Sequence, residues 1–424
     1  MCDESDRETM LYQHSYYRLS TDEKRLIDEL RTRVKNQLTP RYDTDFNLYR
    51  WIKLVERTSK KGVIDSAEKL LRNHLRLRKS LNLDSDDLPS FDENPVHSKR
   101  ILARGYLHLV PSSNRYIWWM DYPEVNVEAI LNTYSARDMV TWQIFLFEYM
   151  LRVANEREKE TGAMSGICGI LDVKNFSVTH GFMSSLNSGH LSYMTQVLYY
   201  ENYPELVYPI NIINVSRILL APYKLIRPFM PHDFTDKFRV CDTNFKKDLL
   251  NQMTEAELPE QLGGKNTRVK SPLLAQKPES CDYYQQRKIR EGKESPLAEH
   301  LSHVQIPARK RKILYVECKA EAKLSWHLEA DAEFMFGVYF MPAKAKMDYE
   351  PRSKEKADVL EKADMVVPLM LVVTRVPETG YHKCSENGIY YLVFCNKHSW
   401  FYRRNVQAKI DVDGEVKRDL AELK

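Results

Sequence analysis

A polar stretch from Lys265 to Pro307 divides this chain of 424 residues into two parts with different patterns of apolar residues. The stretch is rich in Lys, Glu, Gln, Ser and Pro and has few apolar positions, so it predicts a linker, which we place at residues 266–305. Because so few apolar residues cannot join two cores into one, we expect the parts on either side to be independent folding units.

The first part begins with helical periodicity. Residues 1–18 are polar and irregular and predict a flexible tail. The sequence Ser20-Thr21-Asp22-Glu23 has the form of a capping box, and apolar residues follow it at helical spacing. Further helices around Trp51 and from about Ile64 to Leu81 complete a helical N-terminal domain, residues 19–85.

Strand and helix patterns alternate between residues 86 and 265. Residues 106–122 predict a hairpin of two half-buried strands. Apolar strands and amphipathic helices then follow in turn, at 137–158, 167–173, 182–200, 208–215, 217–229, 238–241 and 245–253. This alternation predicts an α/β lobe with a mainly parallel sheet and helical cover.

After the linker, runs of β-branched and aromatic residues recur at short intervals. They lie at 313–318, 324–328, 334–340, 366–374, 389–395 and 401–412. Asn387-Gly388 adds a strong turn signal. The pattern predicts an all-β sandwich at residues 306–413, followed by a tail at 414–424.

Charge, hydropathy and cysteine spacing narrow the class of protein. The net charge of +4 is too small for a chain built to wrap nucleic acid. The longest apolar runs fall far below the roughly 18 to 20 residues that span a bilayer, and the acidic start, Met1 to Asp6, is unlike a secretory leader. Seven scattered cysteines without a Cys-x-x-Cys pair favour a reducing compartment and no zinc site. We therefore expect a cytoplasmic protein, at most peripheral at membranes.

No short catalytic signature is present. The sequence has no dinucleotide-binding or phosphate-binding glycine loop, no G-x-S-x-G elbow and no H-E-x-x-H. Asp172, His180 and Ser192 are the residue types of a catalytic triad, but a His near a strand end is more often a surface or core residue. We expect a protein that is not an enzyme and needs no cofactor or metal.

The helix at 217–229 has the character of a lid. Its apolar residues fall mostly on one side, it follows an apolar strand, and prolines close its end; the residues concerned are Leu219, Leu225, Ile226, Phe229 and Met230. Moving a lipid through water would expose two acyl chains at about 0.8 kcal/mol per CH₂, so a carrier must enclose both. Periodicity alone would favour an ordinary core-packing helix, and only the surrounding motifs favour a lid.

Several motifs in this region occur in an order typical of one family. They are Asn202-Tyr203-Pro204-Glu205, the strand Ile210 to Val215, the lid-like helix, Thr235 to Val240, and Leu258 to Gly264. This set resembles the CRAL-TRIO domain of the phosphatidylinositol-transfer and α-tocopherol-transfer families, over about residues 86–265. Tyr42 to Phe46 with Arg50-Trp51 resembles the helical domain that precedes it in the family.

The resemblance implies a lipid headgroup site. Family members that bind phosphatidylinositol carry an acid and a base at the positions of Glu205 and Lys237. The base would neutralise the phosphodiester, and the acid would accept hydrogen bonds from inositol hydroxyls or hold the lysine in place. A structural salt bridge is the alternative. At the position where the family has a hydroxyl residue, this chain has Phe234, with Thr235 beside it.

A second departure concerns the choice of lipid. Members of the family that bind choline lipids have hydroxyl residues at the positions of Ile167 and Gly169, so binding of a choline lipid by the same contacts is not supported. Phosphatidylinositol or an apolar ligand remains open.

The C-terminal part resembles a GOLD domain. The residues that carry this resemblance are Leu324 to Trp326, Phe336 to Val338, Gly388 to Phe394, Asn396 and Ser399-Trp400. Two functions follow. The first is a carrier that extracts a phospholipid or other hydrophobic molecule during transient membrane contact. The second is a trafficking or signalling interaction protein that binds a partner through the GOLD-like sandwich without lipid exchange.

Two surfaces have ambiguous patterns. Lys69, Arg72, Arg76 and Lys79 form a basic helix face, which most often is simply solvated. The run Lys397 to Arg404 mixes aromatic and basic residues as a membrane-facing loop does, but a buried strand entering the sandwich is the favoured interpretation.

Overall fold

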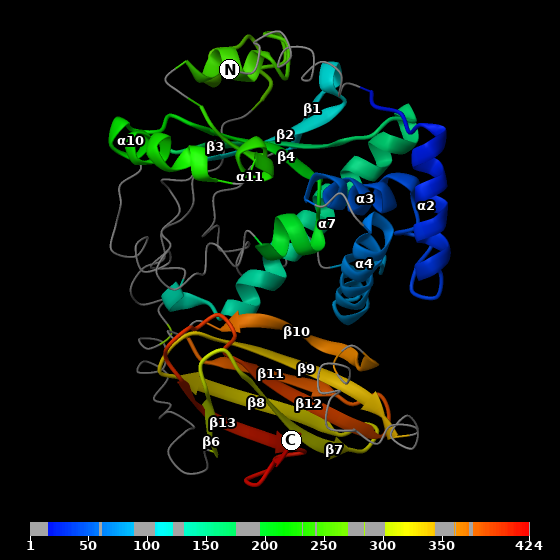
Figure 1. Ribbon diagram of the computed structural model, residues 1–424, viewed down its shortest axis with the longest axis vertical. Coiled ribbons are helices and arrows are strands. Elements are labelled where there is room, and N and C mark those ends of the chain that lie inside the picture. Colours follow the sequence, from blue (N-terminus) through cyan, green and yellow to red (C-terminus); the bar gives the residue numbers. More distant parts are fainter. Residues whose placement is uncertain are drawn as a thin grey trace.

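The computed structural model describes residues 16–58, 62–88, 107–121, 131–174, 196–230, 232–241, 244–269, 284, 302–343, 360, 362–372 and 376–423. Figure 1 shows N-terminal helices beside the sheet of an α/β lobe, with a separate set of strands below them. The predicted helix at 182–200 lies mostly outside the described residues.

The N-terminal helices are α2 (Thr21–Val34), α3 (Asp45–Thr58) and α4 (Val63–Ser80). The predicted capping box is confirmed: the Ser20 hydroxyl accepts from the Glu23 amide, and the Glu23 carboxylate accepts from the Ser20 amide at 2.8 Å. These contacts satisfy amide groups that the start of a helix leaves without intrahelical partners.

The lobe contains a mixed five-stranded sheet in the order β1 (Leu107–Val110), β2 (Arg115–Asp121), β3 (Gly166–Asp172), β4 (Val207–Ile213), β5 (Phe238–Val240). The predicted hairpin is confirmed as the antiparallel pair β1–β2, and the other three pairings are parallel. The helical elements of the lobe are α7 (Ala136–Thr161), η2 (Val197–Asn202), α10 (Arg217–Ile226), η3 (Arg227–Phe229), α11 (His232–Lys237), α12 (Phe245–Leu250) and η4 (Glu260–Leu262).

Antiparallel strands make up the C-terminal part and form two sheets. The first has the order β10 (Asp364–Val372), β9 (Phe334–Pro342), β12 (Gly388–Cys395), β7 (Arg311–Cys318), β15 (Ala421–Glu422). The second has the order β11 (Glu378–Lys383), β8 (Lys323–Ala330), β13 (Arg404–Val412), β14 (Glu415–Val416), and β6 (Ser302–Ile306) also pairs with β13.

Strand pairing corrects both predicted edges of the C-terminal part. β6 begins at Ser302, within the predicted linker, and β14 and β15 lie within the predicted tail. Short polar sequences of this kind carry little strand signal by themselves. Their backbone groups are instead satisfied by neighbouring strands, β13 for β6 and β14, and β7 for β15.

Strand β12, in the middle of the first of these sheets, is buried on both faces. Along β12, the residues Tyr390, Leu392 and Phe394 join the apolar core between the two C-terminal sheets, while Ile389, Tyr391 and Val393 belong to the core cluster that also contains the α4 and α7 residues. This alternation is the period of two that a strand imposes on its side chains. The lobe and the C-terminal strands therefore share one apolar cluster.

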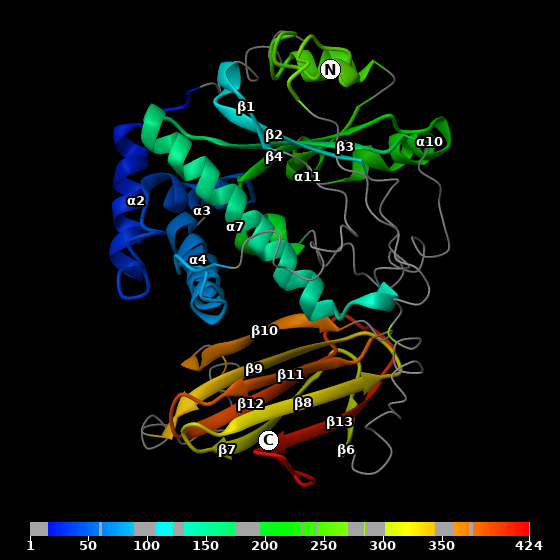
Figure 2. The ribbon, with the colours of Figure 1, turned by 180° about the vertical axis from the view of Figure 1, so that it is seen from behind.

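Polar contacts reinforce this junction. The Arg76 guanidinium on α4 donates to the carbonyls of Leu360, at 2.7 Å, and Ala363. The Ser80 hydroxyl donates to the Val366 carbonyl at 2.8 Å, and Lys79 pairs with Asp364 at 3.0 Å. Both ribbon views place α4 and α7 against β10 (Figures 1 and 2). These contacts of α4 with β10 argue against the predicted independence of the two parts, and independent folding stays a prediction to be tested.

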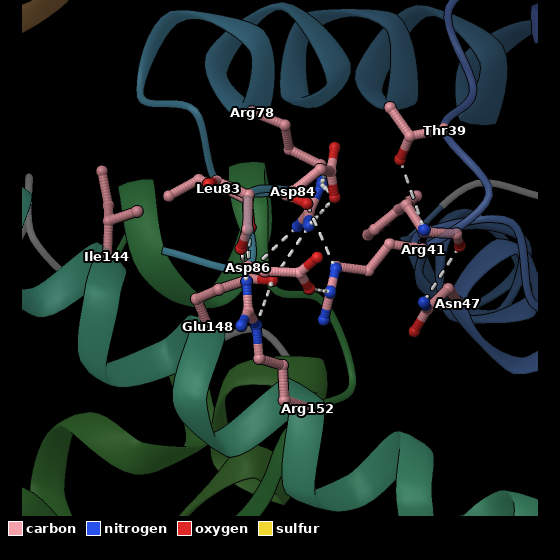
Figure 3. A network of polar contacts seen from close by, with 12 residues as sticks. Thr39, Arg41, Asn47, Arg78, Leu83, Asp84, Asp86, Ile144, Glu148 and Arg152 are labelled. Atoms are coloured by element: carbon pink, nitrogen blue, oxygen red, sulfur yellow. Dashed lines mark hydrogen bonds and ion pairs between the residues drawn. The ribbon is translucent and has the colours of Figure 1, made fainter. Parts of the chain in front are cut away.

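Buried ion pairs fasten the N-terminal helices to α7. Arg78, which is almost fully buried, contacts Glu148 at 2.7 Å and Asp84 at 2.5 Å (Figure 3). Arg152 lies beside the carboxylate of Glu148. Arg50 pairs with Glu158 at 2.7 Å. The gain from a buried pair is largely offset by desolvation, but losing one partner leaves a buried charge unpaired.

We predict that Glu148→Gln lowers the stability of the chain by about 3 kcal/mol, because the buried Arg78 loses its fully buried carboxylate and keeps only the partly exposed Asp84 as a charged partner. The midpoint of denaturant unfolding measures the change. Asp22→Asn is the control, since the Arg25–Asp22 pair is exposed on both sides. Equal midpoints for the two variants would show that the network in Figure 3 contributes nothing to stability.

We further predict that a fragment of residues 1–275 unfolds at a lower denaturant concentration than the same helices do in the full chain. The fragment lacks the strands that complete the shared cluster, so it exposes apolar side chains of α4 and α7 to water. Circular dichroism follows the unfolding of the helices. Coincident midpoints would restore the expectation of independent units.

Candidate functional site

Glu205 occupies a constrained turn immediately before β4. Its φ of 57° is left-handed, which is costly for a residue with a side chain, and its side chain is 3% exposed. The preceding Tyr203 is anchored by its hydroxyl, which donates to the Ile144 carbonyl at 3.2 Å. The Tyr203-Pro204-Glu205 segment is thus fixed against α7, with the carboxylate held inside the protein.

Lys237 ends α11 and is 2% exposed. Its Nζ donates to the Tyr199 carbonyl at 3.1 Å and lies 4.4 Å from the centre of the Tyr200 ring. Burial lowers the pKa of Lys237, and the field of Glu205 opposes that shift. No ion pair within 4.0 Å joins Lys237 to Glu205 in the described part of the chain. Glu205 and Lys237 are thus near enough to influence each other electrostatically, but they do not form the direct salt bridge of the alternative interpretation.

Arg57 on α3 is the closest charged partner of Glu205. Its Nε lies 3.6 Å from Oε2 of Glu205, and its guanidinium stacks 4.4 Å from the centre of the Tyr208 ring. Arg57 was not among the site residues predicted from the sequence. In the sequence, an Arg near the end of an amphipathic helix cannot be distinguished from an ordinary solvent-exposed charge. Only the fold brings α3 to the start of β4.

Two further cations complete the site. Arg115 on β2 donates to the Tyr208 carbonyl at 2.9 Å. Burial lowers the pKa of Arg115, and the negative charge of Glu205 opposes that shift. Lys53, one turn before Arg57, is partly buried, and this burial together with the charges of Arg115, Arg57 and Arg50 lowers its pKa to about 8 against the pull of Glu205. We call Lys53, Arg57, Arg115, Lys237 and Glu205 the cationic cluster.

The cationic cluster has an excess of positive charge and one spare acceptor. Asp233 and Asp236 act on Lys237 and Arg57 from α11, and Asp236 is exposed. Oε1 of Glu205 is buried and accepts no hydrogen bond from any described residue. Such a set can hold an anion between Arg57 and Lys237 while Glu205 accepts from a hydroxyl group of the same molecule.

The remaining predicted contacts are less closely associated with the cationic cluster. The Thr235 hydroxyl donates to the His232 carbonyl of its own helix at 3.0 Å. Leu225 is 76% exposed, so it lies on the outer face of α10, and Met230 is partly buried. The side chains of Leu219, Ile226 and Phe229 lie outside the described residues. Both ribbon views place α10 at the end of the lobe opposite α2 (Figures 1 and 2).

Of the triad considered from sequence, only Asp172 lies among the described residues. Asp172 accepts from the Asn214 amide at 2.8 Å, and His180 and Ser192 lie outside the described residues.

Over the described ranges, no three His, Cys, Asp or Glu side chains gather as metal ligands. Cys168, Cys241, Cys318, Cys384 and Cys395 are buried free thiols. No helix in the same ranges has the length and apolar character to cross a membrane.

Three known families match successive parts of the chain. Residues 19–86 match a domain of unknown function, DUF8435, and residues 104–264 match the CRAL/TRIO domain. Residues 287–418 match a family described as F28H7_8_C:-like, C-terminal domain. The GOLD assignment made from the sequence is not confirmed by these matches.

Similar proteins extend over most of the chain. The CRAL-TRIO domain-containing protein F28H7.8 of Caenorhabditis elegans is 22% identical over 88% of this chain and 86% of its own length. Protein ctg-1 of the same organism is 20% identical over 91% and 97%. The SEC14 cytosolic factor of Eremothecium gossypii is 23% identical over 58% and 78%.

Among solved structures, the crystal structure of Sfh5 aligns with a TM-score of 0.40 and 18% identity, over 69% of this chain and 100% of that chain. The ordered motifs from Tyr203 to Gly264, the mixed sheet that bears them and the match over residues 104–264 agree with one another. The chain therefore carries a CRAL/TRIO domain, and the cationic cluster combines residues of this domain with Lys53 and Arg57 from the preceding helices.

Proposed function

We propose that the chain binds a phospholipid with an anionic, hydroxyl-bearing headgroup, of which phosphatidylinositol is the clearest example, and moves or presents it between membranes on the cytoplasmic side. The CRAL/TRIO domain and the similarity to SEC14 cytosolic factor are consistent with lipid binding or transfer. The observation that carries the headgroup assignment is the buried Glu205 among four cations.

Charge balance supports an anionic ligand. Four cations around one buried carboxylate repel one another in a medium of low dielectric constant. The pKa of Lys53 is lowered first by burial and further by the charges of Arg115, Arg57 and Arg50, while Glu205 opposes the shift. A phosphodiester between Arg57 and Lys237 would offset it through charge-assisted hydrogen bonds. A purely structural ion-pair network would instead be expected to balance its charges internally.

Hydroxyl recognition supports inositol over choline. Oε1 of Glu205 is a buried acceptor that a sugar-like hydroxyl could satisfy, whereas a quaternary ammonium offers no donor. The choline-lipid positions hold Ile167, which is fully buried, and Gly169, whose missing side chain leaves no hydroxyl. The geometry therefore favours a phosphate that carries a polyol.

A gate at α10 is part of the proposal. The exposed Leu225 gives this helix an apolar outer residue, as expected of a lid that touches a bilayer when acyl chains enter. The alternative function, an interaction protein acting through a GOLD-type sandwich, needs neither a gate nor an anion site. It predicts that the purified chain carries no lipid.

The test is native mass spectrometry of the chain purified from cells, with the captured lipids extracted and identified. We expect phosphatidylinositol to be retained. Lys237→Met keeps an unbranched apolar side chain but removes the charge that lies over the Tyr200 ring. Phosphatidylinositol affinity should therefore fall about 10- to 150-fold, because a charge-assisted contact contributes about 1.5 to 3 kcal/mol. Binding of an uncharged ligand such as a tocopherol should change little.

Lys246→Ala is the matched control, because Lys246 lies in the same domain but pairs with Glu255 at the surface. This variant should bind like the wild type. Equal loss of charged and uncharged ligands in Lys237→Met would assign Lys237 a structural role. Absence of any captured lipid from the folded wild type would favour the interaction protein.

The electrostatics of the cationic cluster also predict a pH dependence of stability without ligand. Since the pKa of Lys53 is lowered to about 8 in the folded chain, the unfolded chain binds more protons above that pH, and stability rises as pH increases from about 8 toward 10.5. The wild type should gain about 1 to 3 kcal/mol over this range relative to Lys53→Met. Urea unfolding at several pH values measures this difference, and exposed Lys24→Met should show none.

A further inference from the structure

The segment Lys397 to Arg403, which we call the aromatic loop, presents three consecutive large aromatic side chains to solvent. Trp400 is 67%, Phe401 85% and Tyr402 72% exposed. The sequence favoured a buried strand here, and that interpretation is wrong because β13 begins only at Arg404. Neighbouring exposed aromatics of this size are unusual on a soluble domain and mark an interaction surface.

The aromatic loop is held in one shape by buried polar anchors. The fully buried Asn396 amide donates to the carbonyls of Ile306, at 3.2 Å, and Tyr402, at 2.9 Å. The Ser399 hydroxyl donates to the Tyr402 carbonyl at 2.9 Å. The Arg309 amide donates to the carbonyls of Asn396 and Ser399, at 3.0 and 3.1 Å. The aromatic side chains are therefore presented by a preorganised turn, which reduces the entropy lost on binding.

Positive charge surrounds these aromatics. Residues 307–312 contain four Lys or Arg and residues 396–404 contain three, with no Asp or Glu in either segment. Arg404 pairs with Glu333 and Lys312 with Glu422. Exposed Arg309, Lys310, Lys397 and Arg403 form no ion pair with any described residue, and the Arg309 guanidinium lies 3.7 Å from the centre of the Trp400 ring.

We propose that the aromatic loop, with Arg309 and Lys310, is a docking site for an anionic lipid bilayer. Trp and Tyr side chains favour the boundary between headgroups and acyl chains, where the ring is in an apolar medium and its polar atom remains hydrated. Phe401 would lie deepest because it has no polar atom. The surrounding cations would lie at the level of the lipid phosphates. This proposal does not rest on lipid exchange by the CRAL/TRIO domain.

Charge argues against a second copy of the chain as the occupant. Two such surfaces facing each other would bring at least four cations of each copy together without a carboxylate from either loop, which is repulsive. An anionic membrane supplies the opposite charge over a wide area and accepts apolar side chains beneath it. The exposed aromatic loop therefore suits insertion into an anionic bilayer.

The experiment is sedimentation of the full chain with vesicles of phosphatidylcholine alone or mixed with phosphatidylserine. We expect binding to the anionic vesicles that weakens at high salt. The double variant Trp400→Ala, Phe401→Ala should lower the partition coefficient about tenfold or more, because it removes two apolar rings. Lys397→Glu with Arg403→Glu should lower it by about the same factor on anionic vesicles only.

Matched controls lie on β11. Tyr381 is 66% exposed, and Lys383 on the same strand is also exposed. Tyr381→Ala and Lys383→Glu should each bind vesicles like the wild type. The substituted loop residues are exposed, so thermal unfolding should show that all variants are folded.

A second readout locates the insertion. Brominated lipids should quench the part of the tryptophan emission that Trp400→Phe removes. Lack of wild-type binding to anionic vesicles, equal loss in the Tyr381→Ala control, or emission from Trp400 that brominated lipid leaves unchanged would each overturn the proposal. So would a wild-type dimer that the loop substitutions dissociate, because the loop would then be a contact between copies.

Discussion

The fold of this chain depends on a strand, β12, that is buried on both faces of its sheet. In β12, alternate side chains fill the core between the two C-terminal sheets and the cluster shared with the lobe. A sheet of this kind cannot leave either face in water without exposing a row of large apolar residues. The C-terminal strands and the lobe are therefore coupled by burial, and the polar contacts of Arg76 and Ser80 fix how α4 lies on β10.

Helix α4 connects that junction to the candidate site. One side carries Arg76 to the strands, while His74 is buried among the rings of Tyr42, Trp51 and Tyr203. Burial first, and then the charge of Arg78, lowers the pKa of His74 to about 3, so the ring is neutral at physiological pH and packs as an aromatic. Because Tyr203 belongs to the turn that presents Glu205, α4 contacts both the strands and the support of the cationic cluster.

Local pattern was enough to predict the capping box at Ser20, the β1–β2 hairpin and most strands of both parts, because each depends on neighbouring residues. The pairing of Glu205 with Lys237 was instead implied by the resemblance to the CRAL-TRIO family. Local pattern could not identify Arg57, Lys53 or Arg115, whose roles arise only when α3 and β2 meet the start of β4. The junction was not predicted for a similar reason, because it forms only when α4 and α7 meet the C-terminal strands. The sequence did contain one signal for it. Strand β12 is apolar at nearly every position, whereas a strand with one face in water would alternate apolar and polar residues.

The cationic cluster is costly for the ligand-free chain, and that cost bears on its purpose. Arg50 and Arg78 show how this fold treats a charge needed only for structure: each is paired at 2.7 Å with a buried carboxylate. Lys237 has instead a carbonyl and a ring, and Arg57 reaches Glu205 only at 3.6 Å. Elsewhere this protein pairs its buried cations closely. Loosely compensated cations around a carboxylate oxygen that accepts no hydrogen bond from the described residues therefore support the proposed anionic ligand.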